Sequence, residues 1–198
     1  MRKGIRVIIF FVALWFCFIL WLSIWPGLLV DLLFFTITFS VLWVPLVLPA
    51  AVVFAVMIAA RIDRAWLTPL PKLEISVLTI IGVLTLGMLK YEIPRRLAFV
   101  VSRDAFEQYL VAAKPSKFGG VPIHSRVGLY RVSEYAADPR GGVFFCVYSG
   151  ADGIGPDVMS HGFAYQPNCQ GTPFGAARYH VYHIIGDWYG FRASDDWF

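Results

Sequence analysis

The chain has 198 residues and a net charge of +4, and 58% of its residues are hydrophobic. Its mean hydropathy is +0.65 and only 15% of its residues are charged, against about a quarter in a typical soluble domain, which argues against an ordinary soluble protein. The residues before Tyr91 include seven basic and three acidic side chains, and those from Tyr91 onward include ten of each. A region without net charge has no electrostatic footprint for DNA or RNA, so no nucleic-acid partner is predicted.

Three nearly charge-free apolar runs occupy the first part of the chain, over residues 7–25, 32–60 and 73–89. A helix of about 20 apolar residues crosses the roughly 30 Å hydrocarbon core of a bilayer. The second run is longer than one upright helix needs, and Pro45 and Pro49 would bend it. The third run is short and has Glu74 near its start, which we place at the membrane interface. We therefore predict a membrane α-helical anchor of three transmembrane helices within residues 1–90, with the lipid bilayer as a partner.

Basic residues set the predicted orientation of this anchor. Three of them precede the first run and three lie between the second and third runs, namely Arg2, Lys3, Arg6, Arg61, Arg64 and Lys72. The positive-inside rule places both groups in the cytoplasm, and three spans then put residues 91–198 outside it, in a multi-pass protein of the cell membrane. If the third run lies on the membrane surface instead, the chain crosses the membrane twice, and residues 91–198 are then in the cytoplasm.

The first run is expected to stay in the mature protein. It is longer than the h-region of a signal peptide, about 7–15 residues, and no small-x-small cleavage site follows it. Pro26-Gly27 predicts a tight turn after this run. The first two helices should therefore pack as an antiparallel pair.

Residues 91–198 are predicted to form one small α+β extracytoplasmic domain. The run from Leu97 to Val101 is typical of a buried strand, and Ser102 is placed to cap a helix from Arg103 to about Ala113. Further strands are predicted over residues 126–132, 143–149, 161–165, 178–185 and 188–192. The helix would cover one face of a mostly antiparallel sheet.

Five segments of this domain carry a resemblance. The segments "IPRRLAFVVSRDAFEQYL", "RVGLYRV", "GGVFF", "GFAYQPN" and "GDWYGF" resemble a family of uncharacterised bacterial membrane proteins with N-terminal hydrophobic helices and one small extracytoplasmic domain. The resemblance covers roughly the last hundred residues and implies the architecture predicted above. It implies no activity, catalytic residue or ligand. Asn168-Cys169 after Tyr-Gln-Pro departs from the family pattern.

Cys146 and Cys169 are the two thiols of the domain, and in an exported domain such a pair predicts a disulfide. Closing a loop of this length contributes about 3 kcal/mol to stability. The alternative is a buried Cys146 on a strand and a free Cys169 on a loop.

Histidines and aspartates offer the alternative of an extracytoplasmic hydrolase or metal-dependent enzyme. It would use His161, His180 or His183 with Asp157 or Asp187. His180 and His183 are three residues apart, and on a strand such positions point to opposite faces, so they do not chelate one ion. No Gly-x-Ser-x-Gly motif is present, and no cofactor or metal is predicted. A transporter is disfavoured because the apolar runs contain no ionisable pair near their centres.

The leading functional prediction is a non-enzymatic, membrane-anchored accessory protein whose external domain contacts another membrane or envelope protein. It follows from the neutral, aromatic-rich domain, because aromatic side chains are enriched in interface cores. The candidate contact residues are Trp188, Tyr189, Trp197 and Phe198. The last two belong to a short acidic and aromatic terminus, which is either a docking tail or a packed or solvated end.

Overall fold

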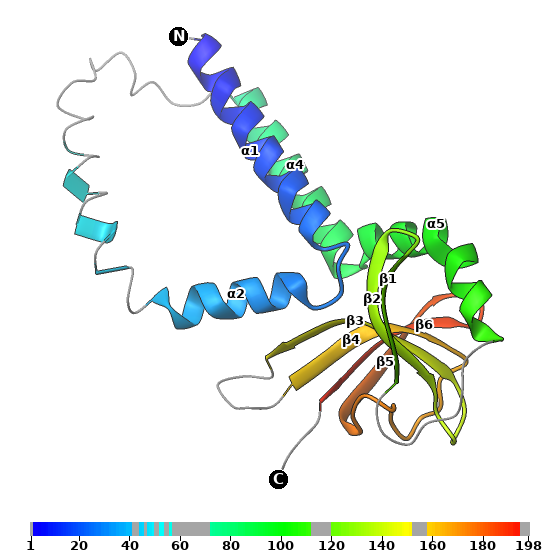
Figure 1. Ribbon diagram of the computed structural model, residues 1–198. Helices are drawn as coiled ribbons and strands as arrows, with labels where there is room; N and C mark the ends of the chain where they lie inside the picture. The colour runs from blue at the N-terminus through cyan, green and yellow to red at the C-terminus, as the bar shows by residue number, and fades with distance from the viewer. Residues whose placement is uncertain are drawn as a thin grey trace.

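A computed structural model describes residues 2–40, 44–45, 47–49, 52–53, 56, 72–111, 120–151 and 158–194 (Figure 1). Its helices are α1 (Arg2–Leu22), α2 (Leu28–Thr38), α4 (Lys72–Lys90) and α5 (Ile93–Leu110). Its strands are β1 (Val121–Val127), β2 (Tyr130–Ala137), β3 (Val143–Ala151), β4 (Val158–Tyr165), β5 (Ala177–Ile185) and β6 (Trp188–Ser194).

The six strands form one antiparallel sheet in the order β1-β2-β3-β4-β6-β5. Strand β6 lies between β4 and β5, so the β5–β6 hairpin folds back to place β6 against β4. The two edges of the sheet are therefore β1 and β5. Both edge strands have register irregularities, β1 between Pro122 and Ser125 and β5 between Ala177 and His180. Such bulges twist an edge strand and hinder pairing with another chain.

Helix α5 packs on one face of the sheet (Figure 1), and its Ala98, Phe99 and Phe106 are part of the main core. Phe99 and Phe106 are fully buried, and the ring of Phe99 lies 4.5 Å from that of Phe163 on β4. Buried Ala98, Phe99, Ser102 and Phe106 follow helical spacing, with every third or fourth residue on the same side. The predicted strand over residues 97–101 and the predicted cap at Ser102 are wrong, because one helix runs through both.

The β1–β2 hairpin corrects a second prediction. One strand was expected over residues 126–132, but the chain turns at Gly128 and Leu129, between the end of β1 and the start of β2. Gly128 has a φ of 60°, in the left-handed region that glycine adopts without strain. The strands expected over 143–149, 161–165, 178–185 and 188–192 lie within β3, β4, β5 and β6.

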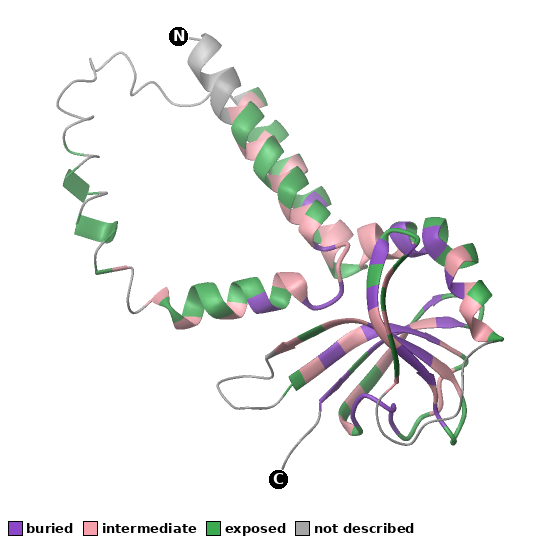
Figure 2. Ribbon diagram, in the orientation of Figure 1, coloured by how far each residue is buried: buried purple, intermediate pink, exposed green. Residues whose placement is uncertain are grey.

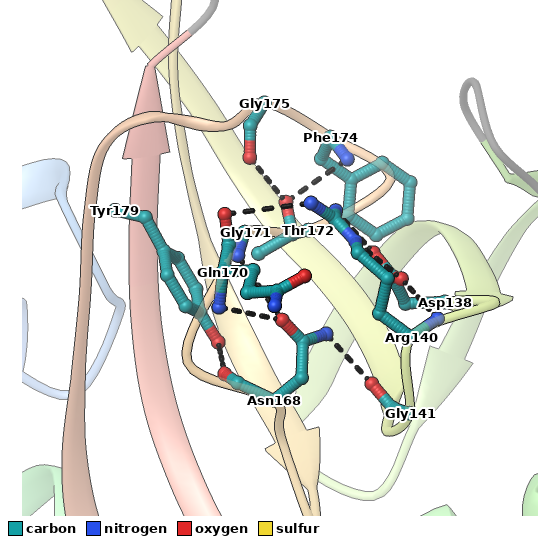
Figure 3. Close-up of polar contacts among 10 residues, drawn as sticks. All are labelled: Asp138, Arg140, Gly141, Asn168, Gln170, Gly171, Thr172, Phe174, Gly175 and Tyr179. Atoms are coloured by element: carbon teal, nitrogen blue, oxygen red, sulfur yellow. Dashed lines mark hydrogen bonds and ion pairs between the residues drawn. The ribbon is translucent and has the colours of Figure 1, made fainter.

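The other face of the sheet is covered by the loop between β4 and β5 rather than by a helix. Phe174 from this loop stacks on Phe191 of β6, with ring centroids 6.3 Å apart. Figure 3 shows the polar contacts that fix the loop. The Oδ1 of Asn168 accepts hydrogen bonds from the backbone N–H groups of Gln170 and Gly171, at 2.8 and 3.1 Å. Its Nδ2 donates a hydrogen bond of 2.8 Å to the carbonyl oxygen of Gly141. The loop is thereby tied to the β2–β3 turn.

Helices α1 and α4 lie side by side and run in the same direction, and both end at the domain (Figure 1). Helix α2 leaves the end of α1 sideways and runs beside the sheet, where it contacts β3. The predicted antiparallel packing of the first two apolar runs is therefore wrong. Gly27 forms the bend between α1 and α2 with a φ of 82°.

The prediction of three transmembrane helices is also wrong. Within the described residues, one helix is long and apolar enough to cross a membrane, over Leu73–Lys90. The shorter apolar helices cover Ile9–Leu22 and Leu28–Thr38. The second of these has 11 residues and spans about 16 Å, roughly half of a hydrocarbon core. The run expected over 32–60 thus begins inside a short helix that ends at Thr38, and most of its remainder lies outside the described residues.

Candidate functional site

Many apolar side chains of α1 and α4 are exposed, and we call them together the anchor surface. Figure 2 shows exposed residues along both helices. The strongly exposed members of the anchor surface are Phe10, Phe11, Leu14, Trp15, Leu73, Ile80, Val83, Leu84 and Leu86, each between 54 and 76% exposed. Monomeric soluble proteins rarely expose apolar patches of more than a few hundred Å². Such exposure is typical of a surface that faces lipid or a protein partner.

The apolar surface continues onto the domain. Leu97 and Val101 of α5 are 60% and 76% exposed, and Leu129 from the β1–β2 turn is exposed beside them. A shallow apolar cavity of about 430 Å³ lies where α1, α4 and α5 meet. Its lining is Leu20, Trp21, Ile24, Met88, Pro94, Leu97, Ala98, Val101 and Leu129. Four exposed apolar residues of α5 and the β1–β2 turn, Leu97, Val100, Val101 and Leu129, are together called the α5 surface.

A buried carboxylate joins α2 to the sheet. Asp31 in the first turn of α2 is 7% exposed, and its Oδ2 accepts a hydrogen bond of 2.7 Å from the hydroxyl of Tyr148 on β3. Burial and the neighbouring Asp31 carboxylate together raise the pKa of Tyr148 to about 12. A Cβ atom on Gly150 would fall on the Asp31 carboxylate, so glycine permits this close approach.

The histidines of the enzyme hypothesis lie apart. His161 on β4 lies beside Gly27 and Tyr148, whereas His180 and His183 are on β5, with β6 between the two strands. The Nε2 of His183 is 2.9 Å from the carbonyl oxygen of Gly186. No group of three His, Cys, Asp or Glu side chains that would hold a metal occurs among the described residues.

The two aspartates of that hypothesis do not supply a common site. Asp187 lies in the β5–β6 turn, where its Oδ2 accepts a hydrogen bond of 3.2 Å from the side-chain amide of Gln166. Asp157 lies outside the described residues.

Two of the four predicted contact residues are described. Trp188 is 1% exposed and belongs to the main core, 5.1 Å from the ring of Phe99, so this structure does not present it to a partner. Tyr189 is half-buried and packs edge-on against His183. Trp197 and Phe198 lie outside the described residues.

Both cysteines of the predicted disulfide are free thiols in the structure. Cys146 is buried in the small core on the loop-covered face, where its Sγ is 3.4 Å from the hydroxyl oxygen of Ser149. Burial raises the pKa of the Cys146 thiol. Cys169 is exposed in the loop between β4 and β5.

Sequence reasoning missed a basic pocket at the junction of α4, α5 and β5. The pocket has a volume of about 270 Å³ and is lined by Lys90, Tyr91, Glu92, Arg96, His180 and Tyr182. The available signal was the cluster of Lys90, Arg95 and Arg96 directly after the third apolar run.

No family model, curated protein or solved structure matches this chain. The resemblance to a family of bacterial membrane proteins therefore stays a prediction.

Proposed function

We propose that the protein is a membrane-anchored accessory protein whose domain contacts another membrane or envelope protein. The observation that carries the proposal is the anchor surface, because α4 presents Leu73, Val83, Leu84 and Leu86 at 62 to 76% exposure. In water each such side chain forgoes about 1.5–3 kcal/mol of burial free energy, and a bilayer removes that cost. Helix α4 inserts in the bilayer, and α1 packs along it.

The α5 surface is the part of the domain that meets the partner. Its exposed apolar side chains belong to α5 and the β1–β2 turn, and α5 follows directly after α4 (Figure 1), so a membrane protein beside α4 is within reach of them. The sheet edges are poor alternatives, because the irregular β1 and β5 strands hinder strand addition. The cores of protein interfaces are rich in apolar residues and poor in charged ones, and the four residues of the α5 surface are all apolar.

The domain lies outside the cytoplasm in this proposal. Helix α1 begins at Arg2 and helix α4 at Lys72, and both of these ends point away from the domain (Figure 1). Arg2, Lys3, Arg6 and Lys72 thus gather at the far end of the helix pair, against Lys90, Arg95 and Arg96 at the near end, where the chain enters a domain of a size that is translocated largely regardless of its charge. The positive-inside rule favours the cytoplasm for the far end.

Membrane extraction tests the anchorage. The full chain is expected to stay with the membrane fraction in alkaline carbonate, and Val83→Arg should move much of it to the supernatant or abolish its accumulation. An arginine at the centre of a membrane helix costs about 3 kcal/mol on insertion scales. Val121→Arg, at an exposed apolar position of β1, is the matched control and should remain in the membrane. Release of the unaltered chain by carbonate would refute the anchorage.

Site-specific crosslinking tests the partner. A photoreactive phenylalanine analogue at Val101 should give a discrete protein adduct in intact cells, whereas the same analogue at exposed Arg131 on β2 should not. Lipid adducts alone at Val101 would contradict the protein contact and leave the α5 surface as a membrane-facing one.

A further inference from the structure

The pocket at the junction of α4, α5 and β5 concentrates cationic groups. Its 270 Å³ are lined by two cations, Lys90 at the end of α4 and Arg96 in the first turns of α5, and by His180 on β5. One carboxylate, that of Glu92, also lines the pocket. Lys90 and Arg96 already outnumber this carboxylate, and the size of the net positive charge depends on how Glu92 is compensated.

Arg95 compensates Glu92. Its guanidinium lies 3.1 Å from the Glu92 carboxylate and also donates a hydrogen bond of 2.7 Å to the hydroxyl of Tyr182. The side chain of Arg95 is 16% exposed and that of Glu92 33%, so this pair is partly shielded from water. Lys90 and Arg96 form no ion pair with any described residue. The pocket thus keeps two uncompensated positive charges.

Arg96 is held by the backbone rather than by a carboxylate. Its Nε donates to the carbonyl of Tyr91 at 3.1 Å, and one terminal nitrogen donates to the carbonyl of Ile184 at 3.3 Å. A guanidinium has five N–H groups in a fixed fork, so three of them are left for a ligand. This arrangement suits a tetrahedral oxyanion, which arginine recognises through two parallel hydrogen bonds.

The turn between α4 and α5 brings Lys90 and Arg96 close together. The helix is interrupted between α4 and α5 at Glu92, which has a left-handed φ of 53°. Lys90, before this interruption, and Arg96, after it, line the same pocket. On the opposite wall, the ring of Tyr182 lies directly over Gly190 of β6, where any Cβ atom would overlap it. Gly190 therefore lets Tyr182 reach Arg95.

We propose that this pocket binds a phosphate group of a mono- or diester, held by Lys90 and Arg96. The pocket lies where α4 ends, next to Tyr91, which is 64% exposed. Aromatic and basic residues at the end of an apolar helix lie at the headgroup level of a bilayer, so an anionic phospholipid presents this phosphate at the right depth. That source rests on the proposed membrane anchorage, whereas a soluble phosphate ester would reach the pocket without it.

Binding is measured with the purified full chain in a nonionic detergent by native mass spectrometry. One arm uses dioleoylphosphatidylglycerol with dioleoylglycerol as its phosphate-free counterpart, and the other uses glycerol 3-phosphate. We expect phosphate-dependent binding in at least one arm, and a loss of about tenfold or more in Lys90→Gln, since a hydrogen bond to a charged group contributes about 1.5–3 kcal/mol. Lys90 is exposed and makes no structural hydrogen bond among the described residues, so this variant should fold.

Arg96→Gln should lose binding similarly and Arg96→Lys should retain part of it, which separates a binding role from the backbone contacts of Arg96. Arg131→Gln, the same charge change on exposed β2, is the control and should bind normally. Equal binding of phosphatidylglycerol and dioleoylglycerol without any glycerol 3-phosphate binding, or equal binding by Lys90→Gln, Arg96→Gln and the unaltered chain, would overturn the site. Release of the chain from membranes by carbonate, with phosphate binding intact, would refute the anchorage alone.

Discussion

The hydroxyl of Tyr148 donates a hydrogen bond of 2.7 Å to the buried carboxylate of Asp31, two residues separated by 117 positions in the chain. Asp31 belongs to a helix in the apolar half of the sequence, and Tyr148 belongs to the sheet of the domain. A buried carboxylate without a hydrogen-bond donor is costly, so this pair specifies where α2 meets β3.

Tyr148→Phe should destabilise the full chain in detergent by about 1.5–3 kcal/mol, because it leaves the Asp31 carboxylate buried without its donor. The difference between the two proteins should shrink as pH rises from about 10 to 12. A raised pKa of the folded phenol means that its contribution is complete below the unfolded value of about 10 and is lost as pH rises through the folded value of about 12. Chemical unfolding at a series of pH values measures both effects.

Tyr189→Phe is the matched control, since Tyr189 is also half-buried but its hydroxyl has no hydrogen bond among the described residues. It should change stability by less than about 0.5 kcal/mol. A cost for Tyr148→Phe no larger than that of the control would show that the Asp31 contact does not hold α2 to the sheet.

Helix α5 illustrates what the sequence alone could not decide. Five consecutive apolar residues from Leu97 to Val101 fit a buried strand and a helix equally well by periodicity. The structure resolves the ambiguity because Ala98 and Phe99 are buried while Leu97, Val100 and Val101 are exposed. A strand that alternates its faces does not bury two adjacent residues on one side. A sequence-based prediction that assumes a soluble domain would assign Leu97, Val100 and Val101 to its buried core.

The later strands were predictable because Gly, Pro and Asp mark the turns between β3, β4, β5 and β6. The pocket was not, because the approach of Arg96 to Ile184 and of Arg95 to Tyr182 joins residues nearly ninety positions apart. The number of membrane helices was misjudged because apolar length was read as one continuous helix, whereas α2 ends at Thr38. Composition identifies an apolar segment, but the helix ends decide what it spans.

Gly128→Ala should cost more than Gly186→Ala, although both glycines have nearly the same left-handed φ, 60° and 55°. A Cβ atom on Gly128 would overlap Ser102, whereas none of the described atoms lies within 4 Å of that position on Gly186. The second variant thus bears only the backbone strain of about 1–2 kcal/mol, and the first also loses the packing of α5 against the β1–β2 turn. Thermal unfolding of the two variants compares the costs.

The structural reason for this cost is testable in the same series. Ser102 Oγ accepts the Leu129 N–H at 3.0 Å, so Ser102→Ala should by itself cost about 1 kcal/mol. Equal unfolding temperatures for Gly128→Ala and Gly186→Ala would show that the turn does not press on α5.

The thiols should differ in reactivity without any reductant. Cys169 is exposed and should react with a maleimide within the native protein, whereas Cys146 is buried with a raised pKa and should react only after unfolding. Peptide mapping by mass spectrometry reads each site separately. Protection of Cys169 until a reductant is added would instead reveal the disulfide that the sequence predicts.

Acid should weaken the loop-covered face of the sheet through Asp138. Burial alone would raise the pKa of Asp138, but hydrogen bonds from the side chain and backbone of Arg140 outweigh it and lower that pKa below its ordinary value (Figure 3). A lowered folded pKa gives stability that is present above the unfolded value of about 4 and is lost as pH falls through the folded value.

Asp138→Asn should therefore be less stable than the unaltered chain at pH 7, and the difference in stability between the two proteins should narrow below about pH 4. Asp104→Asn, the same change at an exposed position of α5, is the control, and urea unfolding of all three proteins is followed from pH 7 to pH 3. A gap that stays constant over this range would mean that the Asp138 carboxylate is not held ionised by Arg140.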